Sequence, residues 1–371
     1  MPYYSGRSGR SGRSGRSGRI IGTATDLGAG DFEHAGGGTS PLLNEALNAT
    51  RDGLVEMQLA VPSPEAAALT AFGTGGAAHR LFALSRIERA AVLQSELVEA
   101  TQVRFPDDDV AEVALAGPDA GPAPVLRIRR PGIARFRDQI DLVGAYADLR
   151  DDRLAEIHLQ ITDQLSFFGA VTPLQPAGFR WTLELLSAVL DYVTMILQRI
   201  KLALGCPRPD MLAPLVQPMI QTPSHGAFPS GHSAQAFAVA EVLTLLRRPD
   251  ETTHVQLRRM ADRIAVNRTV AGVHYPVDSA AGAIAGVALA RVLAARAGTD
   301  AGDGVAGLGF DGDAYAHPDG SARDFDPDAL HALLTPDDAA ATALPATRVT
   351  PAPLLTALWT RAADEWSGRW G

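Results

Sequence analysis

Apolar residues recur at three- and four-residue spacing along much of the chain, which is the pattern of amphipathic helices. The longest such segment, GFRWTLELLSAVLDYVTMILQRIKLALG (178–205), should end at GCPRP because two prolines cannot continue a helix. A connection punctuated by Pro and Gly, residues 117–132, predicts a single short strand. Further helices are expected at residues 41–60, 84–105, 148–170, 233–248, 276–295 and 352–366.

This succession of helices predicts an all-α fold, in which extra N-terminal helices pack on a helical-bundle core. Residues 1–19 repeat a Ser-Gly-Arg triplet that is too polar and too rich in glycine to pack, so we expect a disordered arm there. The alternative is a basic arm that docks on an acidic surface or on nucleic acid. The expected domains are a disordered arm (1–40), an N-terminal helical region (41–150), a catalytic bundle (151–298) and a C-terminal extension (299–371).

Composition narrows the class of protein. The net charge of −9 offers no basic surface for nucleic acid, so we expect no such partner. The single Cys206 excludes an intrachain disulfide. The most apolar segment, 279–298, is interrupted by Arg291 and Arg296, and no apolar run follows the N-terminal arginines. We therefore expect a cytoplasmic protein that has no membrane-spanning segment.

Three short stretches concentrate polar residues within the helical region. They are KLALGCPRPD (201–210), HGAFPSGH (225–232) and NRTVAGVHYPVDS (267–279). The candidate site residues that these stretches supply are Lys201, Arg208, His225, Ser230, Gly231, His232, Arg268, His274 and Asp278.

These residue types suit the binding of a phosphate-like anion. A helix N-terminus presents free backbone N–H groups and a positive dipole end, so the Gly231 amide and the Ser230 hydroxyl can bind anionic oxygens. The side chains of Lys201, Arg208 and Arg268 supply enough positive charge to neutralise a trianion.

The two downstream histidines fit chemistry on that anion. His274 lies just before Pro276, which is favoured in the first turn of a helix, so its ring should lie at the mouth of that helix. Asp278 could accept a hydrogen bond from His274 Nδ1, which would leave Nε2 free to attack phosphorus or to bind a metal oxide. His232 could then act as the general acid.

Each feature also has an ordinary structural explanation. Cationic residues at a helix end often interact only with the helix dipole, and Pro-Ser-Gly before a helix often serves only as an N-cap. A His-x3-Asp pair often makes only a surface hydrogen bond. The occurrence of all three in one chain favours a functional site.

The order, spacing and identity of these residues resemble the three signature motifs of the type 2 phosphatidic acid phosphatase (PAP2) and vanadium haloperoxidase superfamily. The resemblance covers roughly residues 155–297. Asn267 departs from the pattern, since the family most often has Ser before the arginine, and we expect little consequence. The matching motifs are Lys201–x6–Arg208–Pro209, Pro229-Ser230-Gly231-His232 and Arg268–x5–His274–x3–Asp278.

The resemblance implies a helical bundle of the acid phosphatase and haloperoxidase type, with its site among helix ends. His274 would be either a phosphorylated nucleophile or the single protein ligand to vanadium. Asp278 would orient it, and His232 would be the acid–base group. The implied holders of the phosphate or vanadate oxygens are Lys201, Arg208, Ser230, Gly231 and Arg268.

The motifs leave the reaction open, because phosphate and vanadate have similar shape and charge. A haloperoxidase would use vanadate as cofactor and act on hydrogen peroxide and a halide, whereas a soluble acid phosphatase would need no cofactor and hydrolyse a phosphomonoester. We favour the haloperoxidase, because His225 lies seven residues before His232, where bromide-oxidising members typically have a second histidine. Against it stand the short chain, the compact segments between motifs and the alternative that His225 is an ordinary loop histidine.

A third hypothesis is a catalytically idle, anion-binding scaffold on the same fold. Under each hypothesis the partners are small molecules, with neither nucleic acid nor an integral membrane. The C-terminal extension is expected to wrap the bundle or to mediate contacts in a possible homodimer.

Overall fold

The structure is a computed structural model of the 371-residue chain. It describes Glu45, Ala49 and residues 76–116, 121–247, 251–299, 304–335 and 338–367. The predictions for the 1–40 arm therefore lie outside the described residues, as does the helix at 41–60 except for helical Glu45 and Ala49.

The chain divides into two compact units, one of residues 20–89 and one that includes residues 90–371. In the first unit the structure describes α4 (Ala77–Leu81) and the start of α5 (Arg86–Glu99). Ser85 and Glu88 exchange hydrogen bonds there, because the Glu88 carboxylate accepts from the Ser85 amide at 2.9 Å and the Ser85 hydroxyl accepts from the Glu88 amide at 3.4 Å. This reciprocal pairing explains why α5 begins at Arg86.

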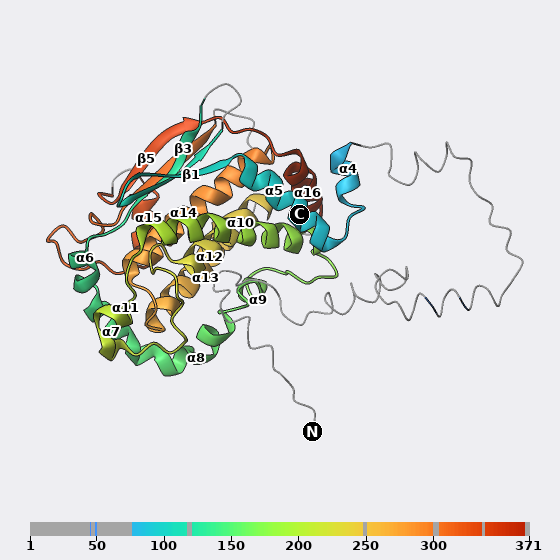
Figure 1. Cartoon of the computed structure of the whole chain (residues 1–371). Helices are drawn as coiled ribbons and strands as arrows, with labels where there is room; N and C mark the ends of the chain where they lie inside the picture. The colour runs from blue at the N-terminus through green and yellow to red at the C-terminus, as the bar shows by residue number, and fades with distance from the viewer. Residues whose placement is uncertain are drawn as a thin grey trace, which may run out of the picture. The chain divides into compact units, whose positions relative to one another are not determined.

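The second unit combines helices with a sheet that lies on one side of them (Figure 1). The helices before the candidate motifs are α6 (Ile133–Asp138), α7 (Ile140–Ala145), the 3-10 helix η1 (Tyr146–Leu149), α8 (Arg150–Leu159) and α9 (Leu165–Gly169). The helices that carry or follow the motifs are α10 (Arg180–Leu204), α11 (Pro209–Leu212), the 3-10 helix η2 (Pro214–Val216), α12 (Gly231–Arg247), α13 (Glu251–Val270), α14 (Pro276–Arg296), α15 (Pro327–Leu333) and α16 (Pro353–Asp364).

The prediction of an all-α fold is wrong, because the chain also forms a five-stranded mixed sheet. Its order is β1-β2-β3-β4-β5, and neighbours are antiparallel except for β3 and β4, which run parallel. Parallel neighbours need a long crossover, and the helices from α6 to α14 all lie in that connection. The strands are β1 (Thr101–Asp107), β2 (Val110–Leu115), β3 (Ala123–Arg129), β4 (Val305–Asp311) and β5 (Ala341–Thr347).

Only β3 was expected as a strand, and the other four were missed for physical reasons. β2 reads VAEVAL and is buried at all but one position, and a strand covered on both faces lacks the alternation that identifies strands. β1 follows α5 almost directly and was absorbed into the helix predicted at 84–105. β4 and β5, VAGLGFD and ATALPAT, have low strand propensity, so their pairing across the sheet decides their conformation.

The predicted helices at 178–205, 233–248, 276–295 and 352–366 are confirmed as α10, α12, α14 and α16. α10 ends as expected, at Gly205 with a φ of 56°, in the left-handed region that glycine adopts easily. The helix expected at 148–170 is broken into α8 and α9, and α13, which carries Arg268, was not expected.

α12 and α14 approach each other so closely that two glycines of α14 form the contact. A Cβ atom on Gly282 would lie 2.5 Å from the Ser230 carbonyl oxygen, and one on Gly286 would overlap the carbonyl oxygen of Ala234. The contact between the helices therefore depends on the absence of side chains at the two ends of GAIAG (282–286). This close packing places the start of α12 against the start of α14.

α14 is buried nearly all round, and it packs against α10, α12, α13, α15, α16 and strands β3 and β4. Its 21 residues have a mean hydropathy of 1.5 over the best window, of which 94% is buried in the molecule. By length and composition it could cross a membrane, although a buried core helix passes the same test.

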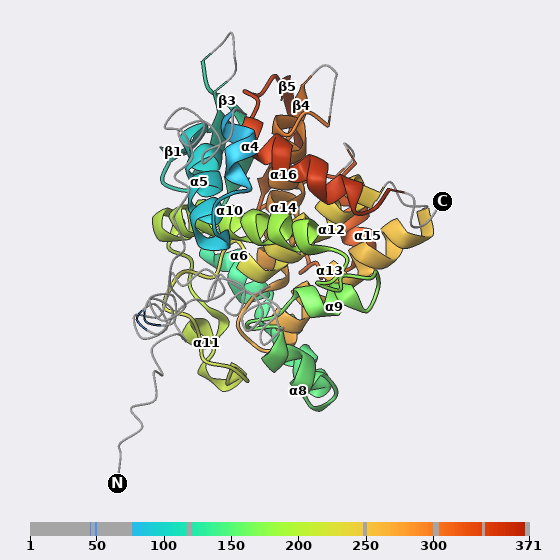
Figure 2. The ribbon, with the colours of Figure 1, turned by 90° about the vertical axis from the view of Figure 1, so that its right-hand side faces the viewer.

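The C-terminal helix, α16, packs against α10 (Figure 2). The Glu365 carboxylate, just after α16, accepts hydrogen bonds from the amides of Trp181 and Thr182, both at 2.8 Å. A carboxylate at a helix N-terminus satisfies free N–H groups and suits the helix dipole. The C-terminal extension thus packs on the bundle, one of the two roles expected for it.

Candidate active site

Lys201 lies in the last turn of α10 and is buried, with 1% of its surface exposed. Its Nζ donates hydrogen bonds to the carbonyl oxygens of Gly226 at 3.0 Å and Ala227 at 2.9 Å. Burial lowers its pKa well below the usual value, and the charge of Arg208 lowers it further. The two hydrogen bonds from Nζ anchor the loop that leads into the Pro-Ser-Gly-His motif.

Arg208, which caps the start of α11, holds two loops at once. Its Nη1 donates to the Val273 carbonyl oxygen at 2.6 Å, and its Nε and Nη2 donate to the His225 carbonyl oxygen at 3.3 and 3.2 Å. A further bond runs from Nη2 to the Gly226 carbonyl oxygen at 3.3 Å. Burial lowers its pKa to about 10, so the guanidinium stays charged at neutral pH.

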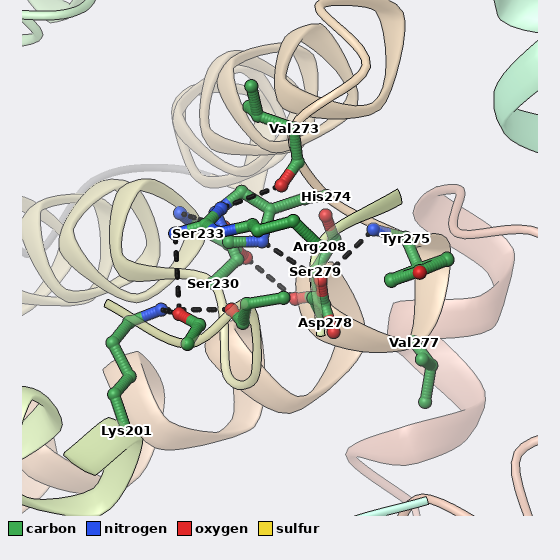
Figure 3. A network of polar contacts seen from close by, with 12 residues as sticks. Lys201, Arg208, Ser230, Ser233, Val273, His274, Tyr275, Val277, Asp278 and Ser279 are labelled. Atoms are coloured by element: carbon green, nitrogen blue, oxygen red, sulfur yellow. Dashed lines mark hydrogen bonds and ion pairs between the residues drawn. The ribbon is translucent and has the colours of Figure 1, made fainter. Parts of the chain in front are cut away.

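His274 lies between Arg208 and Asp278 (Figure 3). Its Nε2 lies 3.0 Å from Arg208 Nη1, and its Nδ1 lies 2.9 Å from Asp278 Oδ2. Because a guanidinium can only donate, Nε2 must be the acceptor and the ring proton belongs on Nδ1, where it donates to Asp278. The predicted hydrogen bond between His274 and Asp278 is thus present.

Electrostatics keeps the His274 ring neutral. Burial lowers its pKa well below 6.5, and the charges of Arg208 and Lys201 act in the same direction. Burial also raises the pKa of Asp278, while the Tyr275 amide, which donates to Asp278 Oδ2 at 3.0 Å, favours the carboxylate. A neutral imidazole oriented in this way has a lone pair on Nε2.

Ser230 and Gly231 lie where α12 begins, beside the start of α14. The Ser230 amide donates to the Asp278 carbonyl oxygen at 2.8 Å, and the Ser230 hydroxyl accepts from the Ser233 amide at 3.4 Å. This second bond is the N-cap of the ordinary structural explanation. From the Cβ position of Gly231 the nearest side-chain atom is Lys201 Cε, at 4.0 Å. The cap therefore lies next to the buried ammonium.

Arg268, in the last turn of α13, uses only part of its hydrogen-bond donors. Its Nη2 donates to the Gln160 side-chain oxygen at 3.0 Å and to the Ile157 carbonyl oxygen at 3.2 Å. Its Nε and Nη1 are buried and have no hydrogen-bond partner among the described residues. Burial alone lowers its pKa to about 9.

His232 has a buried Nε2 that also lacks a partner in the described part of the chain. Its ring donates a hydrogen bond to the main-chain carbonyl of Gln160. Burial lowers the pKa of His232 well below 6.5, and the charges of Arg268, Lys201 and Arg208 lower it further. The charges of all three cations thus act on the His232 ring, and Arg268 lies next to it through their shared neighbour Gln160.

His225 lies at the edge of the site, half-buried. Its Nδ1 is 3.1 Å from Arg208 Nη2 and 3.1 Å from the Gly226 carbonyl oxygen. The structure thus brings every predicted site residue into one cluster, with His225 attached to it through Arg208.

Two parts of the site were missed by sequence reasoning. Gln160, which contacts both Arg268 and His232, lies on a segment with no motif, and nothing in its sequence context distinguishes it from other glutamines. The close approach of α12 and α14 did have a signal, the Gly-x3-Gly spacing of Gly282 and Gly286.

Among the residues that the structure describes, no group of three or more His, Cys, Asp or Glu side chains is placed to hold a metal ion. A phosphate or vanadate held by cations and one imidazole nitrogen needs no such group. The donors present, two guanidinium groups, one ammonium and the α12 N-terminus, fit an oxyanion of either kind.

Comparison with known protein families gives a match for one segment of the chain. Residues 181–299 match the model of the PAP2 superfamily. No curated protein matches the chain. Among solved structures, the first transmembrane PAP2 type phosphatidylglycerolphosphate phosphatase from Bacillus subtilis is 20% identical and has a TM-score of 0.35, over 43% of this chain and 83% of that chain.

The prediction of a cytoplasmic protein is contradicted. It depended on the absence of any helix long and apolar enough to cross a membrane, and α14 is such a helix despite Arg291 and Arg296.

Proposed function

Residues 181–299 of this chain form a PAP2 superfamily domain, and on that premise we propose that the protein hydrolyses phosphomonoesters through a phosphohistidine at His274. The observation that carries the proposal is the neutral His274 ring, with its proton on Nδ1 toward Asp278 and its Nε2 lone pair toward the buried cations. Nucleophilic catalysis requires such an activated, oriented nucleophile.

In the first step, His274 Nε2 attacks phosphorus and the bond from phosphorus to the ester oxygen breaks. The transferred phosphoryl group carries negative charge on its oxygens, which Lys201, Arg208 and Arg268 stabilise together with the Ser230 hydroxyl and the Gly231 amide. An oxygen that binds Arg208 Nη1 replaces its contact with His274 Nε2 and releases the lone pair for attack.

His232 supplies the proton that the leaving oxygen needs. The Gln160 carbonyl accepts from the His232 ring, and the proton for the leaving oxygen is assigned to Nε2, which is buried and has no partner among the described residues. A bound phosphate ester offsets the positive charges that lower the pKa of His232, so protonation becomes easier once substrate is present. The alcohol then leaves in neutral form.

In the second step, water attacks the phosphohistidine. His232, now neutral, takes a proton from that water through Nε2, the bond from phosphorus to nitrogen breaks, and inorganic phosphate leaves. Asp278 accepts from Nδ1 of His274 throughout and steadies the positive charge that the ring acquires while it is phosphorylated.

The haloperoxidase that the motifs first favoured has no observation of its own in support. The same donors would hold vanadate, with His274 as the ligand to vanadium, but the argument for it rested on His225. The Nδ1 of that ring lies 3.1 Å from both Arg208 Nη2 and the Gly226 carbonyl oxygen, so its one hydrogen bond is made to the protein itself. The idle-scaffold hypothesis remains the alternative in which the site binds an anion without turnover.

Two measurements on the full chain test the proposal. We expect orthovanadate to bind in isothermal titration in phosphate-free buffer, and p-nitrophenyl phosphate to be hydrolysed with orthovanadate as inhibitor. His274→Ala should lower kcat by more than about 1,000-fold because it removes the nucleophile. The control is His158→Ala, since His158 is exposed on α8.

The outcomes separate the hypotheses. Hydrolysis by His274→Ala at the wild-type rate would contradict the phosphohistidine. Binding of orthovanadate without hydrolysis would favour the scaffold, and peroxide-dependent bromination of a phenol dye by the vanadate-loaded protein would favour the haloperoxidase.

A further inference from the structure

Gln160 lies just after α8, outside the matched segment 181–299, and is completely buried. It contacts two members of the anion site. Its side-chain oxygen accepts from Arg268 Nη2 at 3.0 Å, and its main-chain carbonyl accepts from the His232 ring. A single residue thus touches both the arginine and the proposed acid.

The orientation of the Gln160 amide is fixed by its neighbours. Asn267 Nδ2 donates to the Glu156 carboxylate at 2.9 Å and to Gln160 Oε1 at 3.0 Å, while Asn267 Oδ1 accepts from Arg153 at 3.2 Å. Because a carboxylate can only accept and a guanidinium can only donate, the Asn267 amide has one possible orientation. Gln160 must therefore turn its oxygen toward Asn267 and Arg268, both of which are donors.

This arrangement gives Arg268 a neutral partner. Among the described residues no carboxylate lies within ion-pair distance of Arg268, and the nearest link to an acid runs through Asn267 to Glu156. A carboxylate in the place of Gln160 would neutralise the guanidinium, whereas an amide oxygen holds it without doing so. The positive charge of Arg268 thus remains available to an anion.

We infer that Gln160, oriented by Asn267, is a positioning residue of the anion site: it holds Arg268 through a neutral acceptor that preserves its charge, and its carbonyl fixes the His232 ring with Nε2 free. The inference rests on the proposed function. It also gives Asn267 a role, because the residue that departs from the family pattern is the one that orients Gln160.

Gln160→Glu tests the inference most sharply. The glutamate side chain has nearly the same size as glutamine and still offers acceptor oxygens. Its negative charge is stabilised by the donors Asn267 Nδ2 and Arg268, so the thermal midpoint of the variant should not fall. Orthovanadate affinity should nevertheless fall at least about 10-fold, because the guanidinium is neutralised. In p-nitrophenyl phosphate hydrolysis KM should rise, and the limb of the kcat/KM pH profile that belongs to His232 should move to higher pH, since a nearby negative charge favours the imidazolium.

The control for the added charge is Gln102→Glu, at an exposed position of β1, which should change orthovanadate affinity less than twofold. If Gln160→Glu fails to fold, the orthovanadate affinity of Gln160→Met tests the inference instead. This variant removes the acceptor that holds Arg268 and should weaken affinity severalfold.

The outcomes are distinct. If wild-type protein binds no orthovanadate, the proposed function fails. If wild type binds and a folded Gln160→Glu, or in its place Gln160→Met, binds within twofold of wild type, the inference about Gln160 is overturned while the proposed function stands.

Discussion

The proposed anion site has two sides that differ in how their donors are used. On the Arg208 side, Lys201 and Arg208 already donate to main-chain carbonyls of residues 225–227 and 273. On the Arg268 side, two nitrogens of Arg268 and the Nε2 of His232 are buried without partners in the described residues. Both sides are buried and cationic, yet among the described residues only on the Arg208 side do acceptors of the protein itself use every cationic nitrogen.

The difference shows which interactions build the site and which await a ligand. A buried polar group without a hydrogen bond costs free energy, roughly 1–3 kcal/mol for each group. The Arg208 side avoids that cost by holding two loops together. The Arg268 side bears it, and a bound oxyanion would remove it, so ligand affinity should depend most on Arg268.

The largest expected effect comes from exchanging the two arginines for methionine in turn. Arg268→Met should weaken orthovanadate binding about 100-fold, because it removes charge-assisted donors that the protein leaves unpaired, and its thermal midpoint should fall little, because the loss of the bonds to Gln160 and Ile157 is offset by the removal of a buried, unpaired charge. Arg208→Met should also weaken binding, but it should lower the thermal midpoint by several degrees, since the Val273 and His225 carbonyls lose their donors. Titration calorimetry and thermal unfolding measure both.

A fall in thermal stability that is equal for the two variants would break the comparison. It would mean that Arg268 is as much a structural residue as Arg208.

The next effect concerns the close contact between α12 and α14, which positions the two sides of the site relative to each other. His232 is on α12 and His274 precedes α14, so a Cβ on Gly282, which would lie 2.5 Å from the Ser230 carbonyl oxygen, should force the sides apart. We expect Gly282→Ala to lower the free energy of unfolding by about 2 kcal/mol and to reduce kcat. Gly144→Ala in α7 is the matched control, since no atom lies within 4 Å of its Cβ position.

Urea unfolding of Gly282→Ala and Gly144→Ala provides the measurement. Equal stability of the two variants would show that α12 and α14 can separate without cost.

The smallest effect is a pH dependence on the Arg268 side. His232 has a folded-state pKa well below 6.5, so the unfolded chain binds the proton first and the stability from this group is lost as pH falls below about 6.5. From pH 7.5 to 5.5, His232→Asn should therefore gain about 1.4 kcal/mol in free energy of unfolding relative to wild type. The raised pKa values of Asp278 and Asp262 act in the opposite direction, so only the difference between variant and wild type isolates His232.

Phosphate should sharpen this result. Because a bound anion favours protonated His232, the relative gain of the variant at pH 5.5 should shrink when phosphate is added. A gain that phosphate leaves unchanged would place His232 away from the anion.

Part of the fold could be predicted because its pattern is local. α10, α12 and α14 have long apolar periodicity, and the Gly205 stop follows from the prolines after it. β2 and β4 could not be predicted in the same way. One is apolar on both faces and the other is rich in glycine, so each becomes a strand only through pairing with its neighbours. The prediction of a cytoplasmic protein was wrong in its premise, because α14 is long and apolar enough to cross a membrane even though it contains two arginines.

Motif spacing in the sequence predicts which side chains the candidate site contains, and the structure places Lys201 at a helix end and Ser230 and Asp278 at helix starts, as that spacing requires. Which of their donors are free can be read only from the folded chain. That depends on loop carbonyls, on Gln160 just after α8 and on the close approach of α12 to α14, all of which join residues far apart in the chain. Hydrogen bonds act over about 3 Å, so no spacing along a sequence reveals them until the chain has folded.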